Sequence, residues 1–163
     1  MENLKVKCNV GLLKICLNDE GEYTVISTDD DTFFERFSDG YKRVMEKAEN
    51  LDAKYAEIDK KYAESDIDRI VEKARAKREF SESAAQIIDS IFGKDTVKKH
   101  FSDIYNEIPD FVPSAECMLS FLEQVTPGIE KLFNKTISER DKASKERMAK
   151  YQPQDHKKPV KNK

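Results

Sequence analysis

The chain has 163 residues, a net charge of −3 and a mean hydropathy of −0.75, and 37% of its residues are charged. This length suits about one domain, and the absence of any run of 18 apolar residues argues against a membrane-spanning protein. Three cysteines without a C-x-x-C pair argue against a disulfide framework, and lysines at positions 5, 7 and 14 exclude an uncharged signal-peptide core, so we expect a cytoplasmic protein.

Alternating apolar residues predict strands near the N-terminus. Residues 4–10 alternate on even positions, and after Gly11 the alternation continues on odd positions, which indicates a bulge or a turn at the glycine. The polar run 18–21 then forms a turn before a returning strand at 23–26. We expect the first 28 residues to form a β-hairpin that lies against helices or pairs its edge with another subunit.

A heptad seam is the strongest pattern in the chain. The predicted helix has several candidate N-caps between Ser27 and Asp31 and ends near Ser65. The seam consists of apolar residues spaced alternately three and four apart along this helix: Phe34, Phe37, Tyr41, Val44, Ala48, Leu51, Tyr55, Ile58 and Tyr62. Such a stripe needs a partner, which is another helix of this chain, a second copy of the chain, or a foreign helix.

A second helical pattern begins at Ile67 and ends at Gly93, which suits a C-terminal capping position. We expect residues 29–93 to form a long helical hairpin, with the polar stretch 72–82 exposed. Within one chain, the seam would close on apolar residues of this second helix: Ile70, Val71 and Ile87.

A C-terminal helical subdomain is expected over residues 94–151, with a short helix near 95–107 and a linker enforced by Pro109 and Pro113. Ser114 can cap a further helix, and Thr126-Pro127-Gly128 predicts a kink or a restart in it. Residues 152–163 form an expected basic, disordered tail. From Lys135 onward ten basic residues face four acids, a charge of +6, which leaves −9 for the remainder.

Reactive groups are scarce. The two histidines, His100 and His156, are not expected to ligate a metal together, and the Gly93-Lys94 pair lacks the upstream glycine of a phosphate-binding loop. We therefore expect no enzyme, no catalytic residues, no metal and no cofactor. The aromatic residues near position 34 either pack as core or form an exposed groove that accepts an apolar helix.

Two segments carry a resemblance to a known family. Ile91-Phe92-Gly93-Lys94-Asp95-Thr96 and Phe121-Leu122-Glu123-Gln124-Val125-Thr126-Pro127-Gly128-Ile129 resemble segments of tail assembly chaperones and other small tail-region proteins of phages and prophages of low-GC Gram-positive bacteria. The resemblance covers roughly residues 85–133. It implies binding to the helical tape-measure protein or recruitment of tail-tube subunits, and a location in the host cytoplasm.

We expect a mainly α protein with an N-terminal β-hairpin, a coiled-coil-like helical hairpin and a C-terminal helical subdomain, acting as an assembly chaperone. The expected partner is a protein client, without membrane or nucleic acid, and a homo-oligomer stays open. Alternatives are an acidic-surface inhibitor of a host defence nuclease and a structural coiled-coil subunit of the virion. The expected partner-binding residues are Phe34, Phe37, Tyr41, Val44, Leu51, Tyr55, Ile58, Tyr62, Phe121, Leu122 and Phe133.

Overall fold

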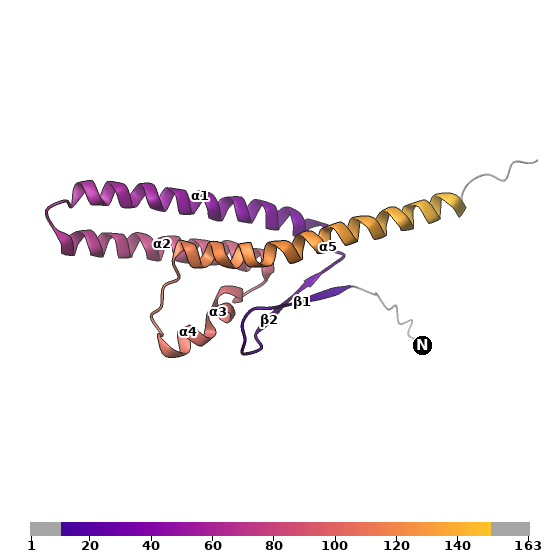
Figure 1. The fold of residues 1–163 in the computed structure, drawn as a ribbon, viewed down its shortest axis with the longest axis horizontal. Coiled ribbons are helices and arrows are strands. Elements are labelled where there is room, and N and C mark those ends of the chain that lie inside the picture. Colours follow the sequence, from indigo (N-terminus) through magenta and orange to yellow (C-terminus); the bar gives the residue numbers. More distant parts are fainter. Residues whose placement is uncertain (1–10, 151–163) are drawn as a thin grey trace, which may run out of the picture. The chain divides into compact units, whose positions relative to one another are not determined.

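The computed structural model describes residues 11–150, and the protein is mainly α with one small sheet, as the sequence predicts (Figure 1). The elements in chain order are β1 (Leu12–Cys16), β2 (Tyr23–Ser27), α1 (Asp31–Lys61), α2 (Asp66–Phe92), α3 (Thr96–His100), α4 (Ser102–Glu107) and α5 (Ala115–Lys150). The predicted strand at 4–10 and the predicted tail at 152–163 lie outside the described residues. The chain divides into a unit ending at Pro127 and a unit beginning at Gly128.

β1 and β2 form the predicted antiparallel hairpin, with Leu13 opposite Ile26 and Ile15 opposite Thr24. The odd-numbered alternation after Gly11 is correct, because Leu13 and Ile15 are less exposed than their neighbours in β1. On β2, Thr24 and Ile26 are buried. One face of the hairpin therefore contributes to the core of the first unit.

Several polar contacts attach the hairpin to the helices. The Thr24 hydroxyl donates to the carbonyl of Phe92 at 2.6 Å, at the C-terminal end of α2. In the turn after β1, the Asn18 amide donates to the carbonyl of Lys99 at 3.1 Å, and the ring nitrogen Nδ1 of His100 lies 2.5 Å from the carbonyl of Leu17. A two-stranded sheet is unstable alone, so these contacts and the buried face hold it in place.

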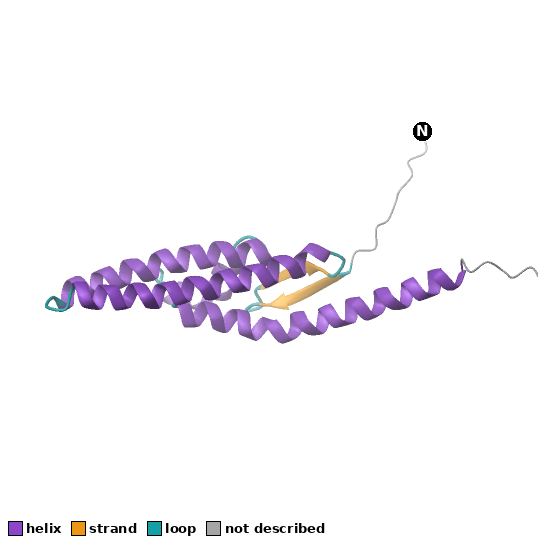
Figure 2. Ribbon diagram, turned by 90° about the horizontal axis from the view of Figure 1, so that it is seen from above, coloured by secondary structure: helices purple, strands orange, loops and turns teal. Residues whose placement is uncertain are grey.

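α1 and α2 lie side by side and run antiparallel (Figures 1 and 2). Asp30 is the N-cap of α1, accepting from the backbone N–H of Thr32 at 3.0 Å, and its hydrogen bond from Arg36 lowers the pKa of its carboxyl group. Ser65 caps α2 in the same manner, accepting from the N–H of Asp68. Asp30 belongs to the predicted set of N-caps.

The expectation that residues 72–82 are exposed is wrong in part. Ala76, Phe80 and Ser81 are buried, because α2 turns this side toward neighbouring elements of the first unit. The predicted end at Gly93 is correct: Gly93 has a φ of 116°, and its N–H donates to the carbonyl of Asp89 at 2.9 Å.

The single short helix expected near 95–107 is two helices, α3 and α4, divided at Phe101. Phe101 has φ −100° and ψ 18°, outside α-helical geometry, and its ring is buried. The Asp89 carboxylate accepts from the N–H groups of Asp95 at 3.2 Å and Val97 at 3.1 Å, so a side chain of α2 caps the first turn of α3.

α5 begins as predicted after Ser114, whose hydroxyl accepts from the N–H of Cys117 at 3.2 Å. α5 stays helical through Pro127, so it has no restart capped by Thr126. The Thr126 hydroxyl instead donates back to the carbonyl of Leu122 at 2.7 Å.

The chain forms two compact units, and the segments expected from sequence, with ends at residues 28, 93 and 151, stay a prediction. The observed division falls at Pro127, inside α5. The hairpin and the helices up to Pro127 share one core through contacts such as those of Thr24, Asn18 and His100. Composition changes along the chain do not reveal such long-range contacts.

Candidate protein-binding surfaces

The heptad seam of α1 is largely covered within the first unit. Val44, Leu51 and Ile58 are buried, as is Ala48. The aromatic members of the seam are half-buried: Phe34, Phe37, Tyr41, Tyr55 and Tyr62. The buried aliphatic positions are therefore inaccessible to a client while α1 and α2 remain packed.

The partner that covers the seam is α2. A Cβ atom built at Gly40 would lie 2.9 Å from Cγ1 of Ile91 and 3.3 Å from Cγ2 of Ile87, so the helices approach closely there. Farther along, the Lys73 ammonium lies 5.5 Å from the ring centroid of Tyr55. Burial raises the pKa of the Tyr55 hydroxyl, opposed by the charge of Lys73.

Of the aromatic residues at the start of α1, Phe33 belongs to the core, whereas Phe34, Phe37 and Tyr41 are half-buried. Phe33 is buried, and its ring centroid lies 5.9 Å from that of Phe92. Phe92 in turn lies 5.6 Å from Phe121 of α5. Phe121 and Leu122, both expected to bind a partner, are buried in this core.

In the second unit, α5 exposes apolar side chains on a basic helix. Phe133 is 41% exposed and Ile137 is 43% exposed, and they lie four residues apart on one face. Residues 128–150 contain seven lysines or arginines and four acids, a charge of +3. Phe133 is the expected binding residue with the largest exposure, so this face can meet a client.

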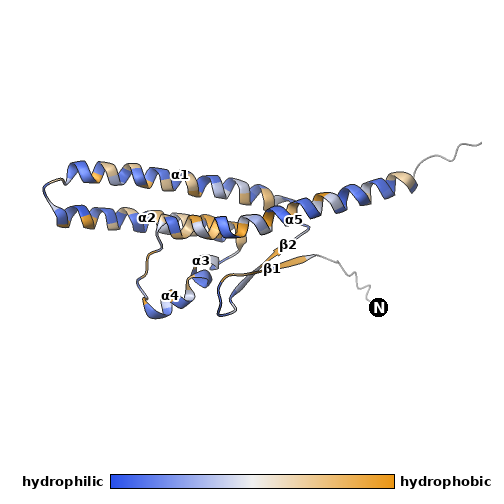
Figure 3. Cartoon of the chain, in the orientation of Figure 1, coloured by the Kyte–Doolittle hydropathy of each residue, from blue (hydrophilic) through white to orange (hydrophobic). Residues whose placement is uncertain are grey.

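An exposed apolar stripe on α2 was not identified as a binding surface from sequence. Ile67, Ile70 and Val71 are 76%, 66% and 42% exposed. The sequence left open whether the seam closes on Ile70, Val71 and Ile87 of the same chain or on a second copy. Closure on Ile70 and Val71 is wrong, because they lie on the side of α2 that faces away from α1. In Figure 3, hydrophobic colouring marks α2 near the end that joins α1.

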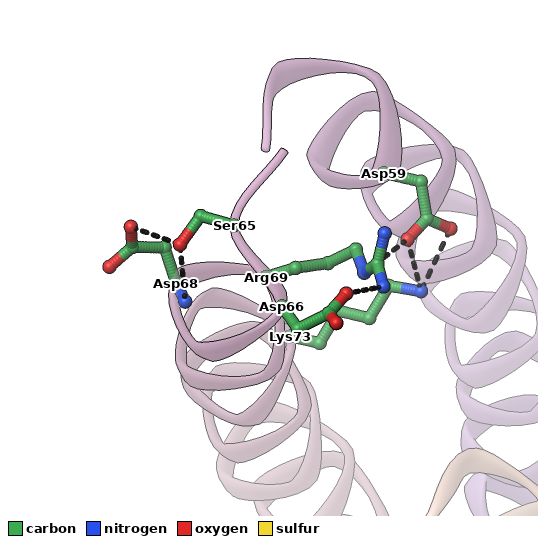
Figure 4. A network of polar contacts seen from close by, with 6 residues as sticks. All are labelled: Asp59, Ser65, Asp66, Asp68, Arg69 and Lys73. Atoms are coloured by element: carbon green, nitrogen blue, oxygen red, sulfur yellow. Dashed lines mark hydrogen bonds and ion pairs between the residues drawn. The ribbon is translucent and has the colours of Figure 1, made fainter. Parts of the chain in front are cut away.

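Charged side chains on the opposite face of α2 explain why Ile67, Ile70 and Val71 face away from α1. Figure 4 shows Arg69 and Lys73 reaching toward Asp59 of α1. The Lys73 ammonium lies 2.7 Å from the Asp59 carboxylate, and Arg69 lies 3.8 Å from it. Since residues 69 and 73 face α1, positions 67, 70 and 71 must point elsewhere at about 100° per residue.

Within residues 11–150, no group of three or more His, Cys, Asp or Glu side chains is arranged to hold a metal ion. None of the helices in that range has the length and apolar composition needed to cross a bilayer. One pocket of the first unit lies beside His100, whose Nδ1 is 2.5 Å from the Leu17 carbonyl oxygen.

Comparison of the chain with protein-family models, with curated proteins and with solved structures finds no match.

Proposed function

We propose that this chain is a non-enzymatic assembly factor that binds a helical protein client, and that the client is the tape-measure or tail-tube protein of a phage tail. Support comes from the resemblance of segments 91–96 and 121–129 to tail assembly chaperones. The mainly α architecture is compatible with it, since amphipathic client helices bind well to apolar faces of other helices.

In this proposal, the residues on which the resemblance rests stabilise the fold and do not bind the client. Phe92 and Phe121 contact each other in the core of the first unit, and Leu122 is fully buried. We therefore assign these positions to the stability of the unit, and place the client on another surface.

The observation that carries the proposal is the exposed apolar face of α5 in the second unit, made by Phe133 and Ile137. The helix that bears this face is basic, at +3 over residues 128–150, but Lys131 and Lys135 lie on its opposite side at about 100° per residue. A client helix with an apolar stripe matches this face through apolar contact.

The test uses the full chain and the tape-measure protein of the same phage, expressed together and purified through a tag on the client. We predict that Phe133→Asp with Ile137→Asp reduces the retained chain at least about tenfold, because two charges enter an apolar contact. Circular dichroism of the variant should match that of the parent chain, since both residues are exposed.

Ile108→Asp is the matched control, because Ile108 is 55% exposed but lies in the first unit. It should leave client binding unchanged. The assay is repeated with the tail-tube protein as the tagged client. Absence of the parent chain from both purified clients contradicts the function, and full binding by the double variant removes the α5 face from it. Substituting Leu51 would not serve as a test, because Leu51 is buried and its replacement by a charge disrupts the α1–α2 pair.

The same complex separates the alternatives. Binding that survives high salt favours the chaperone, whereas steep loss of binding with salt favours an acidic mimic that inhibits a nuclease. Presence of the chain in purified virions favours a structural subunit, because an assembly chaperone leaves before the particle is complete.

A further inference from the structure

The outer face of α2 near its junction with α1 is an apolar stripe on a charged helix. Ile67, Ile70, Val71 and Ala74 follow the i, i+3, i+4, i+7 spacing of one helix face. All four are exposed, so no element of the described first unit covers them. The face is distinct from the α5 surface assigned to the client.

Charged residues border this stripe in an ordered way. At about 100° per residue, one flank of the stripe carries Asp68 toward the N-terminal end of α2 and Arg75 toward the C-terminal end. The other flank carries Asp66 toward the N-terminal end and Lys77 toward the C-terminal end. Each flank is therefore acidic at one end and basic at the other.

We infer that a second copy of this chain docks on this stripe, with the two α2 helices antiparallel across a two-fold axis between Ile70 and Val71. In that arrangement the two copies place identical flanks together with their ends reversed. Asp68 of each copy then lies near Arg75 of the other, and Asp66 near Lys77. Ile67 packs against Ala74, and Ile70 against Val71.

Charge selects the antiparallel orientation. In a parallel pair, opposite flanks meet at the same level, which brings Asp66 against Asp68 and Lys77 against Arg75. Like charges placed opposite each other across an interface are unfavourable. Within one chain Asp66 pairs with Arg69, and Arg75 pairs with Glu72, but these are exposed pairs that rearrange at little cost.

The stripe covers only about two helical turns, so the contact lies at or below the low end of specific interfaces, about 1,200 Å² in total. We expect dissociation in the micromolar range or weaker. Because dimer formation needs no client, its failure is a separate result from failure of the proposed function.

The test is sedimentation equilibrium of the full chain over a concentration series from low micromolar to near millimolar. The expected result is a reversible monomer–dimer equilibrium. Ile70→Glu should weaken it at least about tenfold, because it places two like charges at the two-fold axis. Ile108→Glu, an exposed substitution outside the stripe, should leave it unchanged.

A charge-swap mixture tests the orientation without changing the apolar residues. Asp66→Lys and Lys77→Glu should each weaken the dimer alone, whereas an equal mixture of the two variants should associate more strongly than either. A monomer at every concentration, or a dimer that Ile70→Glu leaves intact, overturns the inference. A mixture no stronger than its components overturns the antiparallel arrangement.

Discussion

Thr24 illustrates how a single side chain connects parts of the chain that are distant in sequence. It lies in β2 and is buried, and its hydroxyl donates to the carbonyl of Phe92, the last residue of α2. The last carbonyls of a helix have no partner within that helix. The Thr24 hydroxyl therefore gives the Phe92 carbonyl at the end of α2 a hydrogen-bond donor, and it connects the sheet to the long helices.

We predict that Thr24→Val destabilises the protein by about 1–3 kcal/mol, because a buried carbonyl loses its donor while the side-chain volume changes little. Urea unfolding followed by circular dichroism measures the change. Thr126→Val is the matched control, since its hydroxyl bonds to a carbonyl inside α5, and its effect should stay within about 0.5 kcal/mol. Equal effects of the two substitutions would contradict a special role for Thr24.

At the scale of the elements, the packing of α1 against α2 depends on a close approach at Gly40. Glycine within a helix costs about 1 kcal/mol relative to alanine, so Gly40 by itself weakens the helix. The helix nevertheless continues through it without interruption. The space that a side chain would take is occupied by Ile87 and Ile91 of α2. Glycine therefore lowers the helix propensity of α1 but lets the two helices pack closely.

We predict that Gly40→Ala destabilises the protein by about 1–3 kcal/mol, the usual cost of overpacking, although alanine is the better helix former. Gly128→Ala is the control, because a Cβ atom there meets nothing within 4 Å. That change should be neutral or stabilising by up to about 1 kcal/mol. Thermal and urea unfolding of both variants measure the difference, and stabilisation by Gly40→Ala would show that the helices separate easily at this point.

At the scale of the whole molecule, the two units differ in charge and in burial. Residues 11–127 contain 16 basic and 26 acidic residues, a charge of −10, whereas residues 128–150 carry +3. The first unit has a core with fully buried side chains such as Val44 and Ile88, and every residue from 138 to 150 is exposed. The first unit is therefore a packed, acidic body, and the second unit carries an exposed, basic helical segment.

Hydrogen exchange should reveal this difference. We predict that amides of residues 138–150 are protected at least about 100-fold less than those of residues 44–51, because an exposed helix of this length is marginal by itself. Exchange of the full chain measured by NMR or mass spectrometry gives both values at once. Similar protection in the two segments would mean that the second unit unfolds only together with the first.

Several elements could be predicted from sequence because their causes are local. The turn at 18–21, the Asp30 and Ser114 caps and the end of α2 at Gly93 each depend on residues within a turn or two of the chain. The heptad seam is equally local, and its aliphatic members are buried as such a stripe requires.

The face that each helix turns inward was harder to predict. Val71 and Ile87 are 16 residues apart, which places them about 160° apart around a straight helix, so both cannot cover the same seam. That phase difference was the available signal for the exposed stripe. The lack of a restart at Pro127 and the division of the short helix at Phe101 had no comparable signal.

By itself, the sequence determined the mainly α class, the hairpin, the helix caps and the existence of apolar stripes, because propensity, capping and periodicity act over a few residues. Only the tertiary structure decided that the seam closes on α2, that Phe121 and Leu122 are core, and that Ile67, Ile70 and Val71 remain outside. The physical reason is that an apolar stripe on a helix favours burial against some surface but does not determine which surface covers it. Long-range packing makes that choice, and the stripes left exposed are the surfaces available for binding.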